Sequence, residues 1–196
     1  MPRTVDYVPE YFPRPEVIRE LLHADQIQVR DDAQYSRQSW QNRTRIRNPD
    51  GWQWLSIPVE RGQFGYSIAR IRIAYHDGWW TRHLKGLRYN YSTTPFYAHY
   101  EPRIVALLDQ KPPTLSELTV ASTKLLLQSL GHEAAWHEAA VDHSLDSDSV
   151  DRSDRILRDQ SIPMYRQNYE GFIPGMSTLD ILFNLGPHQT ADLLSS

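Results

Sequence analysis

The sequence predicts an α/β protein of the mixed α+β kind, folded as one compact domain over residues 1–196. Three observations lead to this prediction. A chain of 196 residues with 40% hydrophobic content suits a single core. Its first third alternates apolar and polar residues and contains a hairpin signal. The rest shows apolar residues at helical spacing. We therefore expect a strand-rich first third with a hairpin, followed by helices packed on the sheet.

The first two predicted elements are a short helix and a strand. Prolines precede the segment EVIRELLHAD, residues 16–25, in which apolar side chains recur every three or four positions. The next segment, QIQVR at 26–30, alternates apolar and polar residues as a half-buried strand does. This strand ends on Asp31 and Asp32.

A β-hairpin and a third strand follow. Two β-rich runs at 44–47 and 52–59 flank the residues Asn-Pro-Asp-Gly at 48–51, whose backbone preferences suit a turn. The run SIARIRIAY at 67–75 carries apolar residues at alternate positions, which predicts the third strand.

Helices dominate the middle of the chain. The patterns at 77–91, 94–110 and 114–131 each predict one helix. Thr114 and Glu117 have the spacing of a capping box, which marks the start of the third of these helices.

The end of the chain is predicted less regularly. Residues 132–160 are acidic, rich in Ser and Asp and weakly periodic, so we expect a partly helical stretch followed by a mobile loop. A closing helix is predicted at 177–187, with Ser177 as its N-cap and Gly186 with Pro187 as its stop.

Composition excludes several classes of protein. The chain has no cysteine, which removes disulfides, thiolate metal sites and a cysteine nucleophile. It has no apolar run of the ~20 residues that a membrane span needs. Its net charge of −3 argues against a generic nucleic-acid binder, and it lacks the Rossmann, Walker, GxSxG and HExxH motifs. We expect a soluble, cytoplasmic protein with no cofactor, no nucleic-acid partner and no membrane span.

The segment DDAQYSRQSWQNRTRIR at 31–47 is the most unusual part of the chain. It follows a predicted strand with acids, amides and arginines that a core would not accommodate, and sites are often built in such loops. Arginines bind carboxylates and phosphates through two parallel hydrogen bonds, so an anionic substrate or a phosphopantetheine-bearing carrier protein is one interpretation. A solvated edge with Asp–Arg pairs explains the segment equally well.

Histidines offer a second candidate. His83 lies in a predicted helix and could act as a general base near neutral pH, although a lone histidine is more often structural. His132 and His137 are five residues apart, which does not place two metal ligands on one helical face.

Sequence blocks in the first, middle and last parts of the chain resemble the WbqC-like protein family. The blocks read AD…DDAQYSRQSWQNRTRI…G..WL.IPV, then W…H.K…..Y…PF, and finally YRQ….F.P.MS.LD.LFN.G, and they cover about three quarters of the chain. The resemblance implies a polar site built from all three blocks: Asp31, Asp32, Gln34, Asn42, Arg43 and Arg45; then Trp79, His83, Lys85, Tyr91 and Pro95; then Tyr165, Gln167, Pro174, Ser177, Asp180 and Asn184.

Two departures from the family pattern stand out. Val8 occupies the position of a glutamine that usually opens the family's sequences. A longer section that normally precedes the last block is missing, and residues 132–160 form a shortened substitute. A narrower acceptor, a pocket completed by a partner, or lost activity would each fit this shortening.

The resemblance implies a role in surface-polysaccharide or natural-product biosynthesis, as an acyl- or aminoacyltransferase that forms an amide bond. The expected partners are a small-molecule amine or sugar and an acyl-carrier or peptidyl-carrier protein. In this hypothesis His83 accepts the proton from the amine, while Asp31 or Asp32 orients the imidazole or binds the amine. A second set stabilises the oxyanion or holds the donor phosphate or acceptor carboxylate: Asn42, Arg43, Arg45 and Lys85.

Two alternatives stay open. One is a non-catalytic scaffold that binds a sugar or a carrier protein through tryptophans, because apolar sugar faces stack on indoles; the residues concerned are Trp40, Trp52, Trp54, Trp79 and Trp80. The other is a metal-dependent enzyme with Asp31, Asp32 and His83 as ligands.

Overall fold

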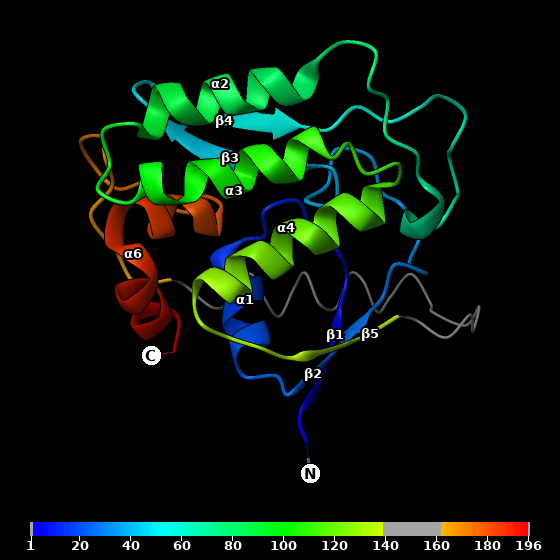
Figure 1. Ribbon diagram of the computed structural model, residues 1–196, viewed down its shortest axis with the longest axis horizontal. Helices are drawn as coiled ribbons and strands as arrows, with labels where there is room; N and C mark the ends of the chain where they lie inside the picture. The colour runs from blue at the N-terminus through cyan, green and yellow to red at the C-terminus, as the bar shows by residue number, and fades with distance from the viewer. Residues whose placement is uncertain (1, 139–161, 196) are drawn as a thin grey trace.

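A three-stranded parallel sheet brings the start of the chain together with the segment that follows α4. The computed structural model describes residues 2–138 and 162–195 (Figure 1). The sheet has the order β1–β2–β5, with β1 at Thr4–Tyr7, β2 at Gln26–Val29 and β5 at Ala135–His137. The predicted strand at 26–30 is confirmed as the central strand.

The outer strands of this sheet were not expected. β1 has four residues, too few for a clear alternation, and β5 has three. The prediction of a partly helical stretch from 132 onward is wrong at β5. That strand forms because Ala135, Trp136 and His137 pair with β2 in parallel, a contact between segments more than 100 residues apart. Residues 139–160 of the predicted acidic segment lie outside the described part.

The helix α1, Pro15–Leu22, connects β1 to β2. It buries Val17, Ile18 and Leu21 on one face, which confirms the helical spacing in the sequence. It ends three residues earlier than predicted.

The predicted hairpin is confirmed as β3, Arg43–Asn48, and β4, Gly51–Ser56, which pair antiparallel from Arg43 opposite Ser56 to Asn48 opposite Gly51. Gly51 has a φ of 135°, a value that favours glycine at the end of the turn. Thr44 and Ile46 are fully buried on one face of β3. The odd-numbered arginines of β3 therefore face the other side of the hairpin.

The prediction of a third strand at 67–75 is wrong. Its place is taken by a 3₁₀ helix, η1 at Ile68–Arg70, followed by two isolated bridges. The buried positions in this run are Ile68, Ile71, Ile73 and Ala74, whose spacing is not that of a strand. The backbone N–H groups of this run donate to carbonyls in a turn and in the loop before α4, so no neighbouring strand runs alongside it.

The three predicted central helices are confirmed as α2 at Trp79–Tyr91, α3 at Tyr97–Asp109 and α4 at Leu115–Ser129. The side chain of Thr114 accepts a hydrogen bond from the backbone N of Glu117, as the capping box predicts. In Figure 1, α2 lies along the β3–β4 hairpin, and it packs on both β3 and α3.

The last helix, α6, spans Thr178–Ser195 and bends at Gly186. The predicted N-cap is confirmed, because Ser177 Oγ accepts a hydrogen bond from the backbone N of Leu179. Gly186 and Pro187 end the first helical segment, as expected, but a second segment follows directly.

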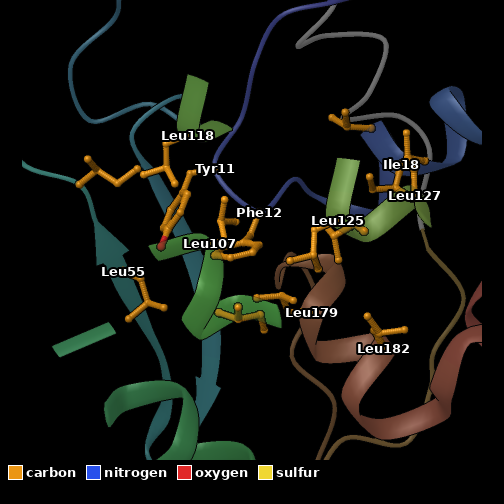
Figure 2. Close-up of a cluster of buried hydrophobic side chains, with 14 of the residues drawn as sticks. Tyr11, Phe12, Ile18, Leu55, Leu107, Leu118, Leu125, Leu127, Leu179 and Leu182 are labelled. Atoms are coloured by element: carbon orange, nitrogen blue, oxygen red, sulfur yellow. The ribbon is translucent and has the colours of Figure 1, made fainter. Parts of the chain in front are cut away.

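The core lies where the N-terminal segment meets α3, α4 and α6. Figure 2 shows Tyr11 and Phe12 between side chains of the later helices, among them Leu107, Leu118 and Leu179. The order of elements and this shared core confirm the mixed α+β prediction. None of the helices described by the structure is long and apolar enough to cross a membrane.

Candidate functional site

The outer face of the β3–β4 hairpin places arginines against tryptophans. Arg45 is directly opposite Trp54 in the register of the two strands. The Cζ atom of Arg43 lies 4.0 Å from the ring centroid of Trp54, and that of Arg45 lies 3.9 Å from the ring of Trp52. These contacts form because alternate residues of paired strands share one face of the sheet.

Trp40 extends this surface beyond the hairpin. Its ring packs edge-on against Trp54 at a centroid distance of 5.1 Å. Arg14 lies over Trp40 at 4.9 Å and forms an ion pair with Glu10. We call the surface formed by Trp40, Arg43, Arg45, Trp52 and Trp54 the arginine–tryptophan face.

Among the described residues, the two arginines of this face have no acidic partner. The Nε–H groups of Arg43 and Arg45 are buried and donate to no acceptor, and no described carboxylate forms an ion pair with either residue. Burial lowers the pKa of Arg45 from its usual value. A buried guanidinium N–H without an acceptor is unfavourable, and a bound carboxylate or phosphate would supply one.

The backbone at Gly175 lies close against the guanidinium of Arg45. A Cβ atom added to Gly175 would lie 3.1 Å from Arg45 Nη1, and Gly175 has a φ of 73°. The backbone N of Ser177 donates to the carbonyl of Arg45 at 2.8 Å. The segment before α6 therefore runs alongside this arginine and helps to hold it.

Asn42 lies at the start of the same hairpin. Its Nδ2 donates to the carbonyl of Ile57 at 3.2 Å, while its Oδ1 is buried without a hydrogen-bond donor. Its amide is therefore only partly satisfied by the protein.

A second group of predicted residues meets around Asp180, at the start of α6. Tyr91 donates to Asp180 Oδ1 at 2.7 Å, and Tyr165 donates to Oδ2 at 2.6 Å. Gln167 Nε2 also donates to Oδ2, at 3.0 Å. The backbone N of Arg47 donates to the Tyr91 hydroxyl at 2.8 Å, which ties this network to β3.

Burial sets the protonation of this network. It raises the pKa of Asp180, although the hydrogen bonds from Tyr165, Tyr91 and Gln167 oppose the shift. Burial and the neighbouring Asp180 charge raise the pKa of Tyr91 and of Tyr165 well above the usual value, so both phenols stay protonated donors. The network is thus saturated with hydrogen bonds, which suits holding a structure in place.

Arg47 shares the face of β3 with the two other arginines but differs from them in its partners. Its guanidinium donates to Gln167 Oε1 at 3.2 Å and to the carbonyls of Asn48, Gly51 and Glu170 at 2.6–2.7 Å. Sequence reasoning missed this role of Arg47, although the alternation of arginines at every second position of a predicted strand was a signal for it. Arg47 joins the Asp180 network to the arginine–tryptophan face.

The two predicted aspartates at the end of β2 have partners of their own. Asp31 Oδ2 accepts a hydrogen bond from Ser116 Oγ at 2.6 Å. Asp32 forms two hydrogen bonds with Arg30, each 3.2 Å long. Gln34 forms an isolated backbone bridge with Ser67, and its side chain is exposed. None of these contacts involves His83.

His83 is enclosed in the core, with 5% of its surface exposed. Its Nδ1 lies 3.0 Å from the Tyr11 hydroxyl and its Nε2 lies 3.2 Å from the carbonyl of Ser56. Because a carbonyl only accepts, Nε2 carries the proton and Nδ1 accepts from Tyr11. Burial lowers the pKa of His83 to about 3, so the ring is neutral at physiological pH.

Of two further predicted residues, Lys85 lies apart from the arginine–tryptophan face and the Asp180 network, and Asn184 lies at the edge of that network. Lys85 is exposed on α2. Asn184 Nδ2 donates to the backbone carbonyl of Asp180, one helical turn away.

Among residues 2–138 and 162–195 there is no cluster of three His, Asp or Glu side chains that could hold a metal ion.

The structure thus divides the predicted site. It places Arg43 and Arg45 on the arginine–tryptophan face, with Asn42 at the start of the same hairpin, and gathers Tyr91, Tyr165, Gln167, Asp180 and Asn184 in the Asp180 network. The aspartates and His83 lie at separate places, so the contact expected between them is not formed. Trp40, Trp52 and Trp54 were named from the sequence only for the scaffold alternative. Arg14 was not predicted, because its contact with Trp40 joins two segments that no local pattern connects.

Comparisons with known proteins agree with the blocks in the sequence. A model described as the WbqC-like protein family matches residues 9–159 and 155–192. A relative from Mycobacterium tuberculosis (strain ATCC 25618 / H37Rv), named "Uncharacterized protein Rv1507c", is 27% identical over 201 residues, which cover 85% of this chain and 86% of the relative. No solved structure matches this chain significantly.

Proposed function

The chain belongs to the WbqC-like protein family, and from this premise we propose that it is an amide-forming acyl- or aminoacyltransferase that holds an anionic substrate on its arginine–tryptophan face. The observation that carries the binding part of this proposal is the pair of arginines, Arg43 and Arg45, that form no ion pair with any acid in the described part of the chain. The reaction itself rests on the resemblance that the sequence blocks show.

The unsatisfied N–H groups and the like charges of the two arginines favour the binding of an anionic ligand. Arg43 and Arg45 lie side by side on one strand, each stacked on an indole, and each keeps a buried N–H without an acceptor. Two neighbouring guanidinium groups repel each other, and a carboxylate or phosphate between them would relieve both the repulsion and the missing hydrogen bonds. Arg47 provides the contrast, because protein carbonyls already accept its hydrogen bonds.

The tryptophans suit the apolar part of such a substrate. Trp52 is 42% exposed although Arg45 covers one side of its ring. An exposed indole beside an anion-binding arginine fits a sugar acid, a sugar phosphate or the phosphopantetheine arm of a carrier protein.

The proposed reaction joins an amine to an acyl group held as a thioester. The neutral amine nitrogen attacks the acyl carbon, a C–N bond forms and the C–S bond breaks. The nitrogen loses one proton, and the sulfur leaves with that proton as a thiol. Arg43 and Arg45 hold the anionic group of one substrate and Asn42 Nδ2 or a guanidinium stabilises the oxyanion. No cysteine is present, so no acyl-enzyme forms through sulfur.

The role of His83 as the base stays a hypothesis. Both its ring nitrogens already bond protein groups, Tyr11 and Ser56, and the imidazole is buried. To accept a proton from a substrate amine, the ring would have to exchange one of these bonds for the amine, a movement that opens the core around Tyr11.

Calorimetric titration with glucuronate, glucose 6-phosphate and inorganic phosphate tests the binding part. We expect Arg45→Gln to lower the affinity for the tightest-binding of these ligands by about tenfold or more, the effect of losing one charge-assisted hydrogen bond. Arg37→Gln is the matched control, because Arg37 lies in the same segment, is exposed and stays outside the arginine–tryptophan face. Equal affinities of Arg45→Gln and the unmodified protein would refute this part.

Mass spectrometry tests the reaction. The protein is incubated with acyl-carrier thioesters and amino sugars, and an amide product that Arg45→Gln fails to form is the expected outcome. The same assay with His83→Ala measures the need for a base, and unchanged turnover would remove His83 from the mechanism. Ligand binding without any amide product would favour the scaffold alternative, for which the exposure of Trp52 is the supporting observation.

A further inference from the structure

The segment between β4 and α2 contains a closed loop at residues 60–72, which includes η1 and which we call the Phe64 loop. Its two ends meet through a hydrogen bond of 3.0 Å from the backbone N of Glu60 to the carbonyl of Arg72. The side chain of Gln63 bridges the ends: it donates to the carbonyls of Glu60 and Arg72 and accepts from the backbone N of Arg72 at 2.7 Å.

The far side of the loop is fixed to the segment after β2. The backbone N of Tyr35 donates to the carbonyl of Tyr66 at 2.9 Å, and that of Ile68 donates to the carbonyl of Ala33 at 2.9 Å. In Figure 1 the chain from β4 to α2 runs along the edge of the molecule opposite α6. The Phe64 loop therefore has a defined shape, held at both sides by backbone hydrogen bonds.

This loop exposes aromatic side chains that the core does not use. Phe64 is 85% exposed and Tyr66 is 41% exposed. Gly62 and Gly65 flank Phe64 with φ values of 80° and 83°, and a Cβ at either glycine would meet nothing within 4 Å. The tight backbone thus presents Phe64 at a protruding tip, where leaving it in water costs free energy unless a partner covers it.

The same loop carries exposed cations. Arg61, Arg70 and Arg72 are all exposed, and the Cζ of Arg70 lies 4.7 Å from the ring centroid of Tyr66. None of the ion pairs between described residues involves these three arginines. Glu60 is the only acidic residue in the loop sequence.

We propose that the Phe64 loop docks this protein on the surface of a membrane that contains anionic lipids. The arginines contact lipid phosphates, and Phe64 inserts into the interface between headgroups and acyl chains, with Tyr66 at headgroup level. This proposal does not depend on the proposed function, since the loop contributes no residue to the arginine–tryptophan face.

The size and shape of the surface favour a lipid partner over a protein. A stable protein interface covers about 800 Å² on each partner, whereas here two aromatic side chains project from one narrow loop. A soft lipid surface accepts such a tip without a matching pocket, and several arginines together strengthen the contact through the surface potential.

Vesicle sedimentation tests the proposal with the full chain. We expect the protein to sediment with vesicles of phosphatidylcholine and phosphatidylglycerol at low salt, to bind vesicles of phosphatidylcholine alone weakly, and to be released by added salt. Phe64→Ser should lower the partition coefficient by about tenfold, as expected for removing one buried aromatic side chain. Arg61→Gln and Arg70→Gln should each lower it by about fivefold.

Tyr89→Ser is the matched control. Tyr89 is 77% exposed on α2, away from the loop, so its replacement should leave vesicle binding unchanged. Circular dichroism should show that every variant keeps the fold, because all the changed side chains are exposed. Failure of the unmodified protein to bind the anionic vesicles, or equal binding by Phe64→Ser, overturns the proposal. Binding of an acidic protein instead of the vesicles would overturn it as well.

Discussion

At the scale of single residues, burial and hydrogen bonding decide which ionisable groups can act. His83, Asp180 and Arg45 are all charged or chargeable and all withdrawn from water to different degrees. His83 has two protein partners and Asp180 has three side-chain donors, whereas Arg45 has none for its Nε. Groups already saturated by the protein hold the fold, and the unsaturated one is free to hold a ligand.

The lowered pKa of His83 makes stability depend on pH. Its pKa is about 3 in the folded protein, against 6.5 for an ordinary histidine, so the unfolded chain binds the proton more tightly. Stability from this group is complete above pH 6.5 and is lost as the pH falls from 6.5 towards 3, by about 5 kcal/mol at most. Urea unfolding measured across this pH range should show that the free energy of unfolding falls less steeply with decreasing pH for His83→Gln than for the unmodified protein.

An exposed histidine provides the control for that measurement. His99→Gln should keep the same slope as the unmodified protein, because His99 is exposed on α3 and its replacement removes no buried side chain. If His83→Gln keeps that slope too, the neutral buried state of His83 is incorrect.

At the scale of elements, glycine conformations and caps set where helices begin, bend and end. Thr114 caps α4 and Ser177 caps α6 by bonds to backbone amides within the first turn. Gly186 bends α6 with a φ of 77° and a ψ of 178°, a combination open essentially to glycine alone. The bend brings Gly186 against the ring of Phe96, the residue before α3.

Replacing Gly186 by alanine should therefore be severely destabilising. The added Cβ would lie 2.5 Å from Phe96 Cζ, and the backbone would be strained as well. We expect a loss of at least about 3 kcal/mol in the free energy of unfolding, measured by urea titration. Gly131→Ala is the control, because Gly131 has a similar φ of 75° with nothing within 4 Å and should lose only about 1–2 kcal/mol. Equal losses would show that the contact with Phe96 does not matter.

At the scale of the whole molecule, the Asp180 network connects three parts of the chain that are distant in sequence. It joins α6 to the end of α2 through Tyr91, to the segment before α6 through Tyr165 and Gln167, and to β3 through Arg47. The arginine–tryptophan face lies on the same strand as Arg47. The network thus fixes the hairpin relative to the helices that support it.

Removing the carboxylate should weaken the whole fold. Asp180→Ala leaves buried donors of Tyr91, Tyr165 and Gln167 without that acceptor, at about 1–3 kcal/mol for each unsatisfied group. We expect the free energy of unfolding to fall by about 3–5 kcal/mol in urea titrations followed by tryptophan fluorescence. Asp180→Asn keeps one acceptor oxygen and should lose less.

Asp192→Ala is the control on the same helix. Asp192 is exposed, so its replacement should change stability by less than about 0.5 kcal/mol. A loss for Asp180→Ala as small as that of the control would mean that the network does not stabilise the fold.

The sequence by itself determined the elements that depend on neighbouring residues. Helical spacing located α1, α2, α3 and α4, and the Asn-Pro-Asp-Gly turn located the hairpin. These signals are local because a helix or a tight turn is formed by residues a few positions apart. The order of polar blocks also identified the family, which the family model confirms.

Only the tertiary structure decided which strands pair and which polar residues meet. β1 and β5 are strands because β2 lies between them, and the run at 67–75 is not a strand because no partner runs alongside it. Asp31 pairs with Ser116, 85 residues away, and His83 pairs with Tyr11, 72 residues away. Such partners depend on how distant segments pack against each other. The same packing decides which polar side chains find protein partners and which, such as Arg45, keep an N–H group without an acceptor.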